Sequence, residues 1–579
     1  MNYSVRNPAL RLRLEGWRSR LLLVLLCTLF VALTGRAAYL QGLRHDFLQK
    51  KGEARYTRKI ELPANRGVVY DRHGEPVAIS TPVESVWASP PDANATASQL
   101  AKLAKILGVQ KTELDERLQD KARGFVYLKR QVPPELAADV AALKIPGVFL
   151  RREYRRYYPA GEVMAHVLGF TGVEDNGQEG LERAFQSTLA GQPGEKRVIK
   201  DRAGHIVEDI EQIQLPKDGK PLTLSIDSKI QYLAYRELKA AVLANRAKAG
   251  AIVVLDTRTG EVLGLASLPD YNPNNRSRLK PDQIRNRTVT DTFEPGSTLK
   301  PITIAAALES GKITPDTHIQ TAPGSLVVGN RTIRDTHPQG DLTVSQIIQK
   351  SSNVGAAKIA LSLKAETMWD QFKDMGFGST PHSGLQAEAG GNVRPFQTWR
   401  PIEQATMSYG HGISVSLLQL ARAYTTFASG GELKPITIVK SEAVVEGKRV
   451  MSPRTAKAVT AMLELAVQAG GTGTKAQVPG YRVAGKTGTA HKLAGGKGYA
   501  RDRYVSSFVG FAPVSAPQLV IAVMIDEPSA GEYYGGTVAA PVFSKVMEGA
   551  LRSLSVAPDA PLKEWTEPVN SATEVKEET

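Results

Sequence analysis

The sequence predicts an α+β domain that follows one membrane-spanning helix and a mixed α/β domain. Three observations lead to this prediction. Strand-like segments occur near residue 250 and again after residue 480, a long and mostly helical stretch separates them, and one apolar run lies near the N-terminus. An antiparallel sheet made of early and late strands, with helices on both sides, is an α+β arrangement and not a parallel doubly wound fold.

The N-terminus reads as a basic tail, residues 1–20, followed by a transmembrane anchor, residues 21–41. The twenty residues from Leu21 to Leu40 carry one charge, Arg36. This length crosses a hydrocarbon core of about 30 Å, and a terminal arginine can extend to the interface. The basic flank predicts a cytoplasmic N-terminus and an exported body. A cleaved signal peptide is the alternative, but the long apolar run without a small-x-small cleavage site favours an uncleaved anchor.

Residues 45–215 form a charge-rich segment that we interpret as a pedestal domain. NRGVVYDRHGEPVA predicts strand, turn and strand, with residues 71–74 in the turn. His166 lies among apolar residues, where a packed structural role is expected. The segment shows no catalytic constellation, which favours a scaffold role.

Residues 216–553 carry the patterns of the main domain. PLTLSID predicts a strand, and Asp227 is a suitable N-cap for the helix that follows. AGAIVVLDTRTGEVLGLAS predicts a hairpin. YRVAGKTGTA, YVSSFVGFAP and QLVIAVMID predict late strands, and VAAPVFSKVMEGALRSL predicts a closing helix. The tail, residues 554–579, is poor in apolar residues, which predicts disorder.

Composition narrows the function classes. The formal net charge of +15 favours an anionic neighbour, such as nucleic acid, a membrane surface or a polyanionic polymer. The single cysteine, Cys27, excludes a disulfide framework, and the chain has no CxxC or HExxH spacing. These absences exclude zinc-finger and zincin chemistry.

FEPGSTLKP, residues 293–301, places Ser297 and Lys300 directly after a Pro-Gly turn. Apolar spacing predicts a helix over residues 298–308, with Gly311 as its C-cap. Lys300 would then lie one turn after Ser297 on the same face. A serine hydroxyl becomes a nucleophile when a neighbouring amine of lowered pKa takes its proton.

Two further motifs follow in order. KSSNVG contains Ser351 and Asn353, and GKTGTA contains Lys486 within a predicted strand. The order S-x-x-K, S-x-N, K-T-G is the signature of serine β-lactamases and penicillin-binding proteins. A second S-x-x-K, Ser277 to Lys280, lies in an Asn- and Arg-rich loop and is interpreted as chance.

With RGVVYDRHGEPVA, RRYYPAGEVMAHVLGF, GQEGLE and SYGHGIS, these motifs resemble the class B penicillin-binding proteins. Within them the chain is most similar to the division-specific peptidoglycan D,D-transpeptidases of the FtsI type (penicillin-binding protein 3 of Gram-negative bacteria). The resemblance extends to about residue 553. It implies a penicillin-binding, serine β-lactamase-like transpeptidase domain that acts through a serine acyl-enzyme and needs no metal and no cofactor.

The resemblance also implies roles. Ser297 would attack the penultimate D-Ala carbonyl with Lys300 as general base, and Ser351 would pass a proton toward the leaving amine. Asn353 would bind the substrate amide, and Lys486 would add positive potential. The remaining expectations concern substrate binding: Thr487, Gly488 and Thr489 at the substrate carboxylate, backbone N–H groups of Ser297 and Thr489 as the oxyanion hole, and Tyr409, Tyr504, Tyr533 and Tyr534 around the pocket.

The implied partners are peptidoglycan stem peptides, β-lactams as covalent inhibitors, an FtsW-type glycosyltransferase, the FtsQLB complex and FtsN. The implied location is the inner membrane at the division septum, with the catalytic domain in the periplasm, so nucleic acid is not expected as a partner. An elongation-specific class B transpeptidase remains an alternative.

Other readings fit less well. A β-lactamase would need a deacylating glutamate, and Glu388 to Asn392 has an E-x-x-x-N spacing that its two glycines make more typical of a turn. A penicillin-sensing receptor would need more transmembrane segments. A bifunctional glycosyltransferase would need more room than residues 45–215 provide. A non-catalytic division scaffold has no support, because all three motifs are intact.

Overall fold

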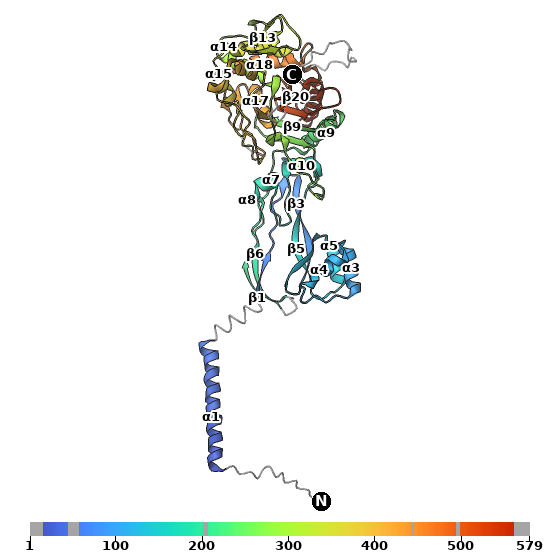
Figure 1. Ribbon diagram of the computed structural model, residues 1–579, viewed down its shortest axis with the longest axis vertical. Helices are drawn as coiled ribbons and strands as arrows, with labels where there is room; N and C mark the ends of the chain where they lie inside the picture. The colour runs from blue at the N-terminus through green and yellow to red at the C-terminus, as the bar shows by residue number, and fades with distance from the viewer. Residues whose placement is uncertain (1–14, 45–56, 201–205, 442–444, 494–497, 561–579) are drawn as a thin grey trace. The chain divides into compact units, whose positions relative to one another are not determined.

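The computed structural model describes residues 15–44, 57–200, 206–441, 445–493 and 498–560 (Figure 1). The chain divides into two compact units, each built from separate stretches of sequence. Unit 1 comprises Met1–Ala64, Glu84–Arg152 and Gln192–Lys217, and unit 2 comprises Asn65–Val83, Glu153–Gly191 and Asp218–Thr579. The predicted C-terminal disorder falls mostly on residues 561–579, which lie outside the described residues.

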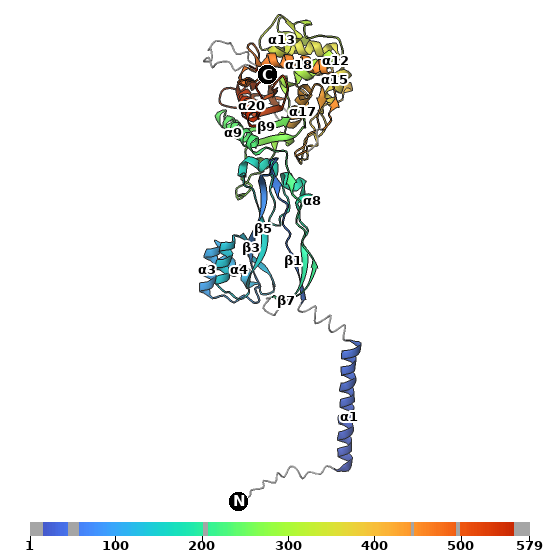
Figure 2. The ribbon, with the colours of Figure 1, turned by 180° about the vertical axis from the view of Figure 1, so that it is seen from behind.

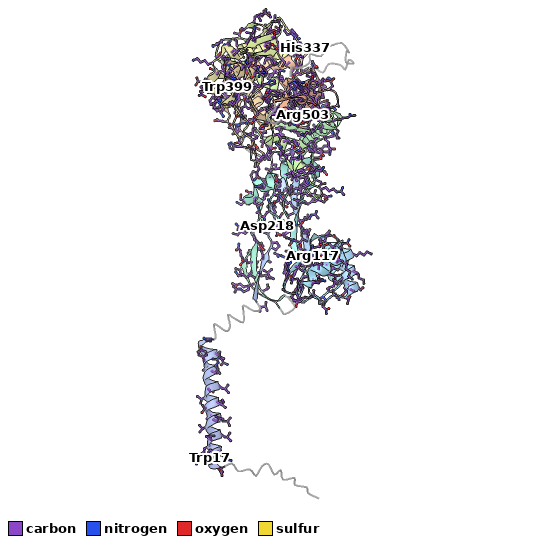
Figure 3. The ribbon with its side chains drawn as sticks, in the orientation of Figure 1. Trp17, Arg117, Asp218, His337, Trp399 and Arg503 are labelled. Atoms are coloured by element: carbon purple, nitrogen blue, oxygen red, sulfur yellow. The ribbon has the colours of Figure 1, made fainter. Side chains whose placement is uncertain are left out.

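The N-terminal helix α1 spans Gly16–Ala38, and the π-helical turn η2 (Tyr39–Leu43) continues it. Among the described residues it is the one helix long and apolar enough to cross a membrane. Trp17 lies at its N-terminal end (Figure 3), a position typical of an interfacial aromatic residue. The helix therefore fits the expected single-pass anchor, while most of the basic tail, residues 1–14, lies outside the described residues.

Unit 1 contains an antiparallel sheet and a small helical subdomain. The sheet has the order β1 (Thr57–Leu62), β6 (Gly194–Lys200), β7 (Ile206–Gln214). The subdomain consists of α3 (Ala97–Leu107), α4 (Lys111–Gln119), β4 (Val126–Val132) and α5 (Pro134–Ala142) around a core that includes Leu103, Leu107 and Leu128. Helix α3 begins at a Thr96–Gln99 capping box and ends at left-handed Gly108, as helix-capping rules predict.

The predicted strand–turn–strand of unit 2 is present. Strand β2 (Val69–Tyr70) pairs antiparallel with the start of β3 (Pro76–Ala88) and parallel with β8 (Leu222–Thr223). The Asp71 carboxylate accepts hydrogen bonds from the backbone N–H groups of His73 and Glu75, each 2.9 Å long. Strands β3 and β5 (Val148–Tyr157) contribute residues to both units.

The centre of unit 2 is a five-stranded antiparallel sheet. Its order is β10 (Val262–Leu268), β9 (Ala249–Asp256), β21 (Leu519–Asp526), β20 (Tyr499–Ala512), β19 (Ala484–Leu493). The predicted hairpin supplies β9 and β10, and the three predicted late strands supply the rest. All residues of β9, β10 and β21 are buried, because helices cover both faces. Strand β19 lies at one edge.

Helices α9 (Ser228–Ala244) and α20 (Ala540–Ser553) cover one face of the sheet, and α12 (Lys300–Glu309), α17 (Leu417–Ala428) and α18 (Pro453–Val467) lie on the other side (Figures 1 and 2). As predicted, the Asp227 side chain caps α9 by accepting from the backbone N–H groups of Lys229 and Ile230. The predicted α+β class, with an antiparallel sheet between helices, is confirmed.

Shorter elements complete unit 2. They are η3 (Gly161–Met164), α6 (Ala165–Leu168), α7 (Gly180–Ala184), α8 (Gln186–Leu189), α10 (Pro281–Ile284), α11 (Arg287–Thr290), β11 (Thr292–Phe293), η4 (Gly296–Leu299), β12 (His318–Gln320), β13 (Ser325–Val328), β14 (Arg331–Arg334), β15 (Asp341–Thr343), α13 (Val344–Lys350), α14 (Asn353–Ser362), α15 (Ala365–Asp374), η5 (Phe396–Thr398), α16 (Pro401–Met407), β16 (Val415–Ser416), β17 (Glu432–Leu433), β18 (Lys448–Arg449), η6 (Thr474–Ala476) and α19 (Gly535–Val538). Most lie between β10 and β19, as the sequence predicts.

Candidate active site

The first predicted motif forms a 3-10 turn that leads into a helix. Ser297 lies in η4, and α12 starts at Lys300, so the helix predicted from residue 298 begins two residues later than expected. Residues three apart eclipse each other in a 3-10 turn, which keeps Ser297 and Lys300 on one side. Pro301 occupies the first turn of α12, where a missing N–H has no cost. Ser310 is the C-cap, and Gly311, with φ of 70°, follows it.

Two contacts fix this turn. Tyr424 lies on α17, and its hydroxyl donates a 2.8 Å hydrogen bond to the Thr298 carbonyl. Gly410 has φ of 87°, and a Cβ there would lie 2.2 Å from the Gly296 carbonyl oxygen. A side chain at Gly410 would therefore displace the turn that carries the serine.

Lys300 and Ser351 form the central contact of the site. Lys300 is fully buried, and its Nζ donates to the Ser351 carbonyl and, over 3.0 Å, to Ser351 Oγ. Ser297 is 3% exposed, and its Oγ makes no hydrogen bond within the described part of the chain. Catalytic hydrogen bonds are often long before substrate arrives.

Ser351 sits between two helices in an unusual conformation. It is the C-cap of α13 with φ of 62°, a left-handed value rare for a residue with a side chain. Ser352 follows as the N-cap of α14 and accepts a 2.9 Å hydrogen bond from the Gly355 N–H. This reversal presents both the hydroxyl and the carbonyl of Ser351 to Lys300.

Asp335 braces the same turn and was missed by sequence reasoning. Its carboxylate accepts from the Ser352 hydroxyl over 2.7 Å and from the Val354 N–H over 2.8 Å. Asn353 is 7% exposed, and its Nδ2 donates to the Arg334 carbonyl over 3.3 Å. Arg334 and Asp335, at the C-terminal end of β14, therefore hold the S-x-N motif in place. No local sequence pattern marks these two residues as its partners.

Strand β19 presents the third motif. The fully buried Lys486 donates to Thr487 Oγ1 over 3.2 Å and to Thr472 Oγ1 over 3.4 Å. The Thr472 and Thr487 hydroxyls are 2.7 Å apart. Thr489 Oγ1 accepts a 3.0 Å hydrogen bond from the Gly535 N–H. These contacts fix the two threonine side chains on the edge strand.

The serine turn lies directly against β19. A Cβ at Gly488 would lie 2.8 Å from the Pro295 carbonyl oxygen, and a Cβ at Gly296 would lie 3.1 Å from the Thr489 carbonyl oxygen. The backbone segments that contain the Ser297 and Thr489 N–H groups are therefore neighbours. Two such donors near one point are what an oxyanion hole requires.

Three of the predicted tyrosines form one aromatic row. The ring centroids of Tyr504 and Tyr533 are 4.0 Å apart, and those of Tyr533 and Tyr534 are 4.4 Å apart. His491, to which sequence reasoning assigned no role, extends the row with its ring 4.6 Å from Tyr504. Tyr409 is 6% exposed and packs instead against His411, with centroids 5.2 Å apart.

The penicillin binding protein transpeptidase domain model matches residues 250–548, and the penicillin-binding protein dimerisation domain model matches residues 61–224. The chain belongs to the penicillin-binding protein transpeptidase family. The probable peptidoglycan D,D-transpeptidase PenA of Neisseria gonorrhoeae is 43% identical to this chain. The alignment covers 94% of this chain and 94% of PenA. Peptidoglycan D,D-transpeptidase FtsI of Escherichia coli K12 is 41% identical, covering 94% of this chain and 93% of that one.

A solved structure supports the fold. The transpeptidase domain of Burkholderia pseudomallei penicillin-binding protein 3 is 49% identical, with a TM-score of 0.54, and covers 58% of this chain and 98% of that one. The resemblance predicted from the motifs is confirmed. This penicillin-binding protein therefore carries the three motifs on the fold that the family shares.

A second group of polar residues beside the serine was missed by sequence reasoning. Glu294 accepts a 2.9 Å hydrogen bond from the Gly412 N–H, and the Tyr499 hydroxyl lies 2.9 Å from both of its carboxylate oxygens. The His411 and Tyr499 ring centroids are 5.9 Å apart. Glu294 and His411 lie inside FEPGSTLKP and SYGHGIS, so these motifs were the available signal.

The electrostatics of this group follow from its burial. Burial raises the pKa of Glu294 above its usual value, although hydrogen bonds from Gly412 and Tyr499 oppose the shift. Burial, with smaller Coulombic contributions from Lys300 and His491, lowers the pKa of His411 to about 4. At neutral pH His411 is therefore neutral.

Two other candidates have structural roles in this penicillin-binding protein. His166 is buried, with Nε2 2.8 Å from the Gln283 carbonyl, and burial lowers its pKa to about 4. The Glu388 carboxylate accepts from the backbone N–H groups of His382 (2.6 Å) and Ser383 (2.8 Å). His166 therefore links α6 to α10, and Glu388 holds the backbone at residues 382–383. The described residues contain no group of three potential metal ligands.

Proposed function

We propose that this chain is a peptidoglycan D,D-transpeptidase that cross-links stem peptides through an acyl-enzyme on Ser297. The observation that carries the proposal is the gathering of Ser297, buried Lys300 and Ser351 against the K-T-G strand, with Lys300 Nζ 3.0 Å from Ser351 Oγ. PenA and FtsI, which are similar to this chain over 94% of its length, are both named as peptidoglycan D,D-transpeptidases.

Acylation begins with proton transfer from the Ser297 hydroxyl to the Lys300 amine. Serine Oγ attacks the penultimate D-Ala carbonyl carbon, and the N–H groups of Ser297 and Thr489 receive the oxyanion. The proton then passes from Lys300 through Ser351 to the leaving amine, and the terminal D-Ala departs. A base in this position contributes about 10²–10⁴-fold to the rate.

The edge strand and the aromatic row position the substrate. Asn353 binds the peptide amide, and the hydroxyls of Thr487 and Thr489, beside Gly488, bind the terminal carboxylate. Lys486 supplies positive potential from its buried position. The row of Tyr504, Tyr533 and Tyr534 forms one wall of the pocket, and Tyr409 adds an aromatic ring beside His411. No metal and no cofactor take part in these steps.

β-Lactams acylate the same serine and leave slowly. A β-lactamase requires a general base that activates water for deacylation, and the sequence offers Glu388 for that part. Its carboxylate is engaged by two backbone N–H groups of residues 382–383. This engagement favours a transpeptidase over a hydrolase.

The cellular setting extends the proposal. Helix α1 anchors the chain in the inner membrane with the N-terminus cytoplasmic and the catalytic domain in the periplasm at the division septum. The partners are an FtsW-type glycosyltransferase, the FtsQLB complex and FtsN, which contact the anchor and the pedestal. Resemblance to division-specific relatives motivates this assignment.

Covalent labelling tests the chemistry. The full-length chain in detergent is incubated with a fluorescent penicillin beside Ser297→Ala, and the adduct is located by peptide mass spectrometry. A slowly released adduct on Ser297, absent from the variant, supports a transpeptidase. Rapid penicillin turnover supports the hydrolase, and a folded wild-type chain without any adduct refutes both enzymatic readings.

The pedestal assignment has its own test. Replacing residues 84–152 with a short Gly-Ser linker removes the middle stretch of unit 1 and leaves the three stretches of unit 2 intact. We expect retained penicillin labelling but lost septal recruitment. Normal recruitment would contradict the docking role.

Depletion in cells separates division from elongation. Filamentous cells are expected for a division enzyme, whereas rounded cells would support the elongation-specific alternative.

A further inference from the structure

Glu294 is a carboxylate held rigidly beside the nucleophile. It precedes Ser297 by three residues, and three hydrogen-bond distances of 2.9 Å, one to the Gly412 N–H and two to the Tyr499 hydroxyl, fix both of its oxygens. Such triple restraint sets the direction in which the carboxylate points.

The backbone that carries Glu294 is also fixed. The following residues press against β19 at Gly488 and against Gly410, as the Cβ distances of 2.8 Å to the Pro295 carbonyl oxygen and 2.2 Å to the Gly296 carbonyl oxygen indicate. Glu294 therefore cannot shift relative to Ser297 without displacing the edge strand. This coupling places it within one short turn of the acylated atom.

A pocket of about 210 Å³ opens beside Glu294. Its walls include β11 and the continuation of β19 past the K-T-G motif, from Ala490 to Leu493. The pocket therefore extends from the carboxylate along the same strand that carries Thr489. Glu294 thus lines this pocket and precedes Ser297 by only three residues in the chain.

The other two acidic residues that line the pocket, Asp526 and Asp291, already form ion pairs. Asp526 accepts from Lys492 at 2.7 Å through each oxygen, and Asp291 pairs with Arg287 at 2.9 Å. Among the described residues, Glu294 has no ion pair, and neighbouring His411 is neutral at pH 7. A half-buried carboxylate without a cation, in a chain of net charge +15, fits a cationic ligand.

We propose that Glu294 is a further catalytic residue, which binds the ammonium group of the acceptor stem peptide in this pocket and takes its first proton. The inference rests on the proposed transpeptidase function and adds the step by which the acceptor becomes a nucleophile. An amine is a nucleophile only when deprotonated, and at neutral pH a primary amine arrives as an ammonium ion.

The proton balance is complete within the site. The ammonium gives one proton to the Glu294 carboxylate, and the neutral nitrogen attacks the ester carbonyl carbon. The new C–N bond forms, the bond between that carbon and Ser297 Oγ breaks, and a second nitrogen proton passes through the Lys300 amine to Oγ. Glu294 then releases its proton to solvent, which restores the free enzyme.

Acceptor competition tests the proposal. The full-length chain in detergent is acylated by a D-alanyl thioester, and the ratio of aminolysis to hydrolysis is measured with D-alanine, an ammonium ion at pH 7, and with hydroxylamine, a neutral nucleophile at that pH. The ratio belongs to the acyl-enzyme alone, so it does not depend on the acylation rate.

For Glu294→Gln we expect the ratio with D-alanine to fall about 10²-fold, while the ratio with hydroxylamine changes less than about twofold because no proton need be removed first. An unchanged D-alanine ratio would overturn the proposal. An equal fall with both acceptors would also overturn it, because the residue would then only shape the site.

Two further variants secure the result. Glu366→Gln removes an equal charge from an exposed position on α15, and we expect wild-type ratios. If Glu294→Gln forms no acyl-enzyme, Tyr499→Phe replaces it, because it removes the hydroxyl that orients the carboxylate and retains the ring. A wild-type D-alanine ratio in Tyr499→Phe then overturns the proposal. A wild-type chain that forms no acyl-enzyme would instead refute the proposed function.

Discussion

Unit 2 buries basic side chains in two places and surrounds them in two ways. In one place, Arg66 and Arg156 each donate from Nε to the Glu182 carboxylate over 2.6 Å, and all three side chains are at most 1% exposed. In the other, Lys300 donates to the hydroxyl and carbonyl of Ser351, and Lys486 donates to threonine oxygens. The two arginines and the two lysines are all buried. The arginines contact a charged carboxylate, whereas the lysines contact neutral hydroxyl and carbonyl oxygens.

The difference separates a structural charge from a reactive one. A guanidinium does not lose its proton in a protein, so a buried arginine needs a permanent counter-charge. A lysine amine can lose its proton, and neutral oxygen partners allow both protonation states. We infer that the cluster of Arg66, Arg156 and Glu182 holds the fold, whereas the lysine cluster performs proton transfer.

The largest expected effect comes from removing the reactive charge. In Lys300→Met, the apolar replacement fills the buried volume, and we expect acylation by fluorescent penicillin to slow about 10²–10⁴-fold. The thermal midpoint should change little, because a buried charge can often be exchanged for an apolar group without loss. Labelling at the wild-type rate would remove the distinction between the two clusters.

The structural cluster should respond in the opposite manner. Glu182→Gln leaves two buried guanidinium groups without their carboxylate, and we expect the free energy of unfolding to fall by about 3–5 kcal/mol. Urea unfolding of the full-length chain in detergent, followed by tryptophan fluorescence, measures this. Glu179→Gln, a half-buried neighbour outside the cluster, serves as the control. Equal stability of the two variants would contradict the assignment.

Buried histidines show a third solution, which is to remain neutral. Burial lowers the pKa of His166 and of His411 to about 4, below the usual 6.5. The folded chain then binds fewer protons than the unfolded chain between pH 6.5 and 4. Stability is therefore fully present above pH 6.5 and falls as the pH drops to 4, on the order of 3 kcal/mol for each residue.

Stability measured across that range checks the expectation. His166→Gln and His411→Gln should each flatten the acid side of the profile, because glutamine does not titrate. Only His411→Gln should also change penicillin labelling, since His411 lies near Lys300. A profile identical to that of the wild type in both variants would show that these histidines are not the groups responsible.

An exposed ion pair gives the smallest expected effect. Arg482 binds Glu464 through two hydrogen bonds of 2.7 Å, but its side chain is 45% exposed. Solvent screens such pairs, so Arg482→Ala should lower the free energy of unfolding by less than about 1 kcal/mol. A loss as large as that of Glu182→Gln would mean that burial does not govern these energies.

Local patterns predicted much of this molecule. The hairpin β9–β10, the late strands, the Asp227 cap and the three motifs were readable because each depends on residues near in sequence. Tyr504, Tyr533 and Tyr534 were expected near the pocket from the family resemblance, and the folded chain shows that their rings stack in a row.

Long-range placement was not readable. Glu294, His411 and Tyr499 come from three distant segments, and only the folded chain brings them together. The same applies to Arg66, Arg156 and Glu182, which lie in the quoted motifs but whose ion pairs no local pattern marks. The 3-10 turn at Ser297 also escaped prediction, because the packing of Gly410 and Tyr424 against it imposes that geometry.

The pairing of β9 with β21 has a consequence for how the protein is made. Asp256 in β9 pairs with Leu519 in β21, so the central sheet cannot close until nearly all of the chain has been synthesised. At about 5–20 residues per second, the early hairpin waits on the order of tens of seconds for its partner strand. During that interval β9, whose residues are all buried in the finished sheet, has no partner on one side, and an unpaired apolar edge is a site of aggregation. The order of the strands along the chain therefore exposes the nascent protein to aggregation until β21 emerges and pairs with β9.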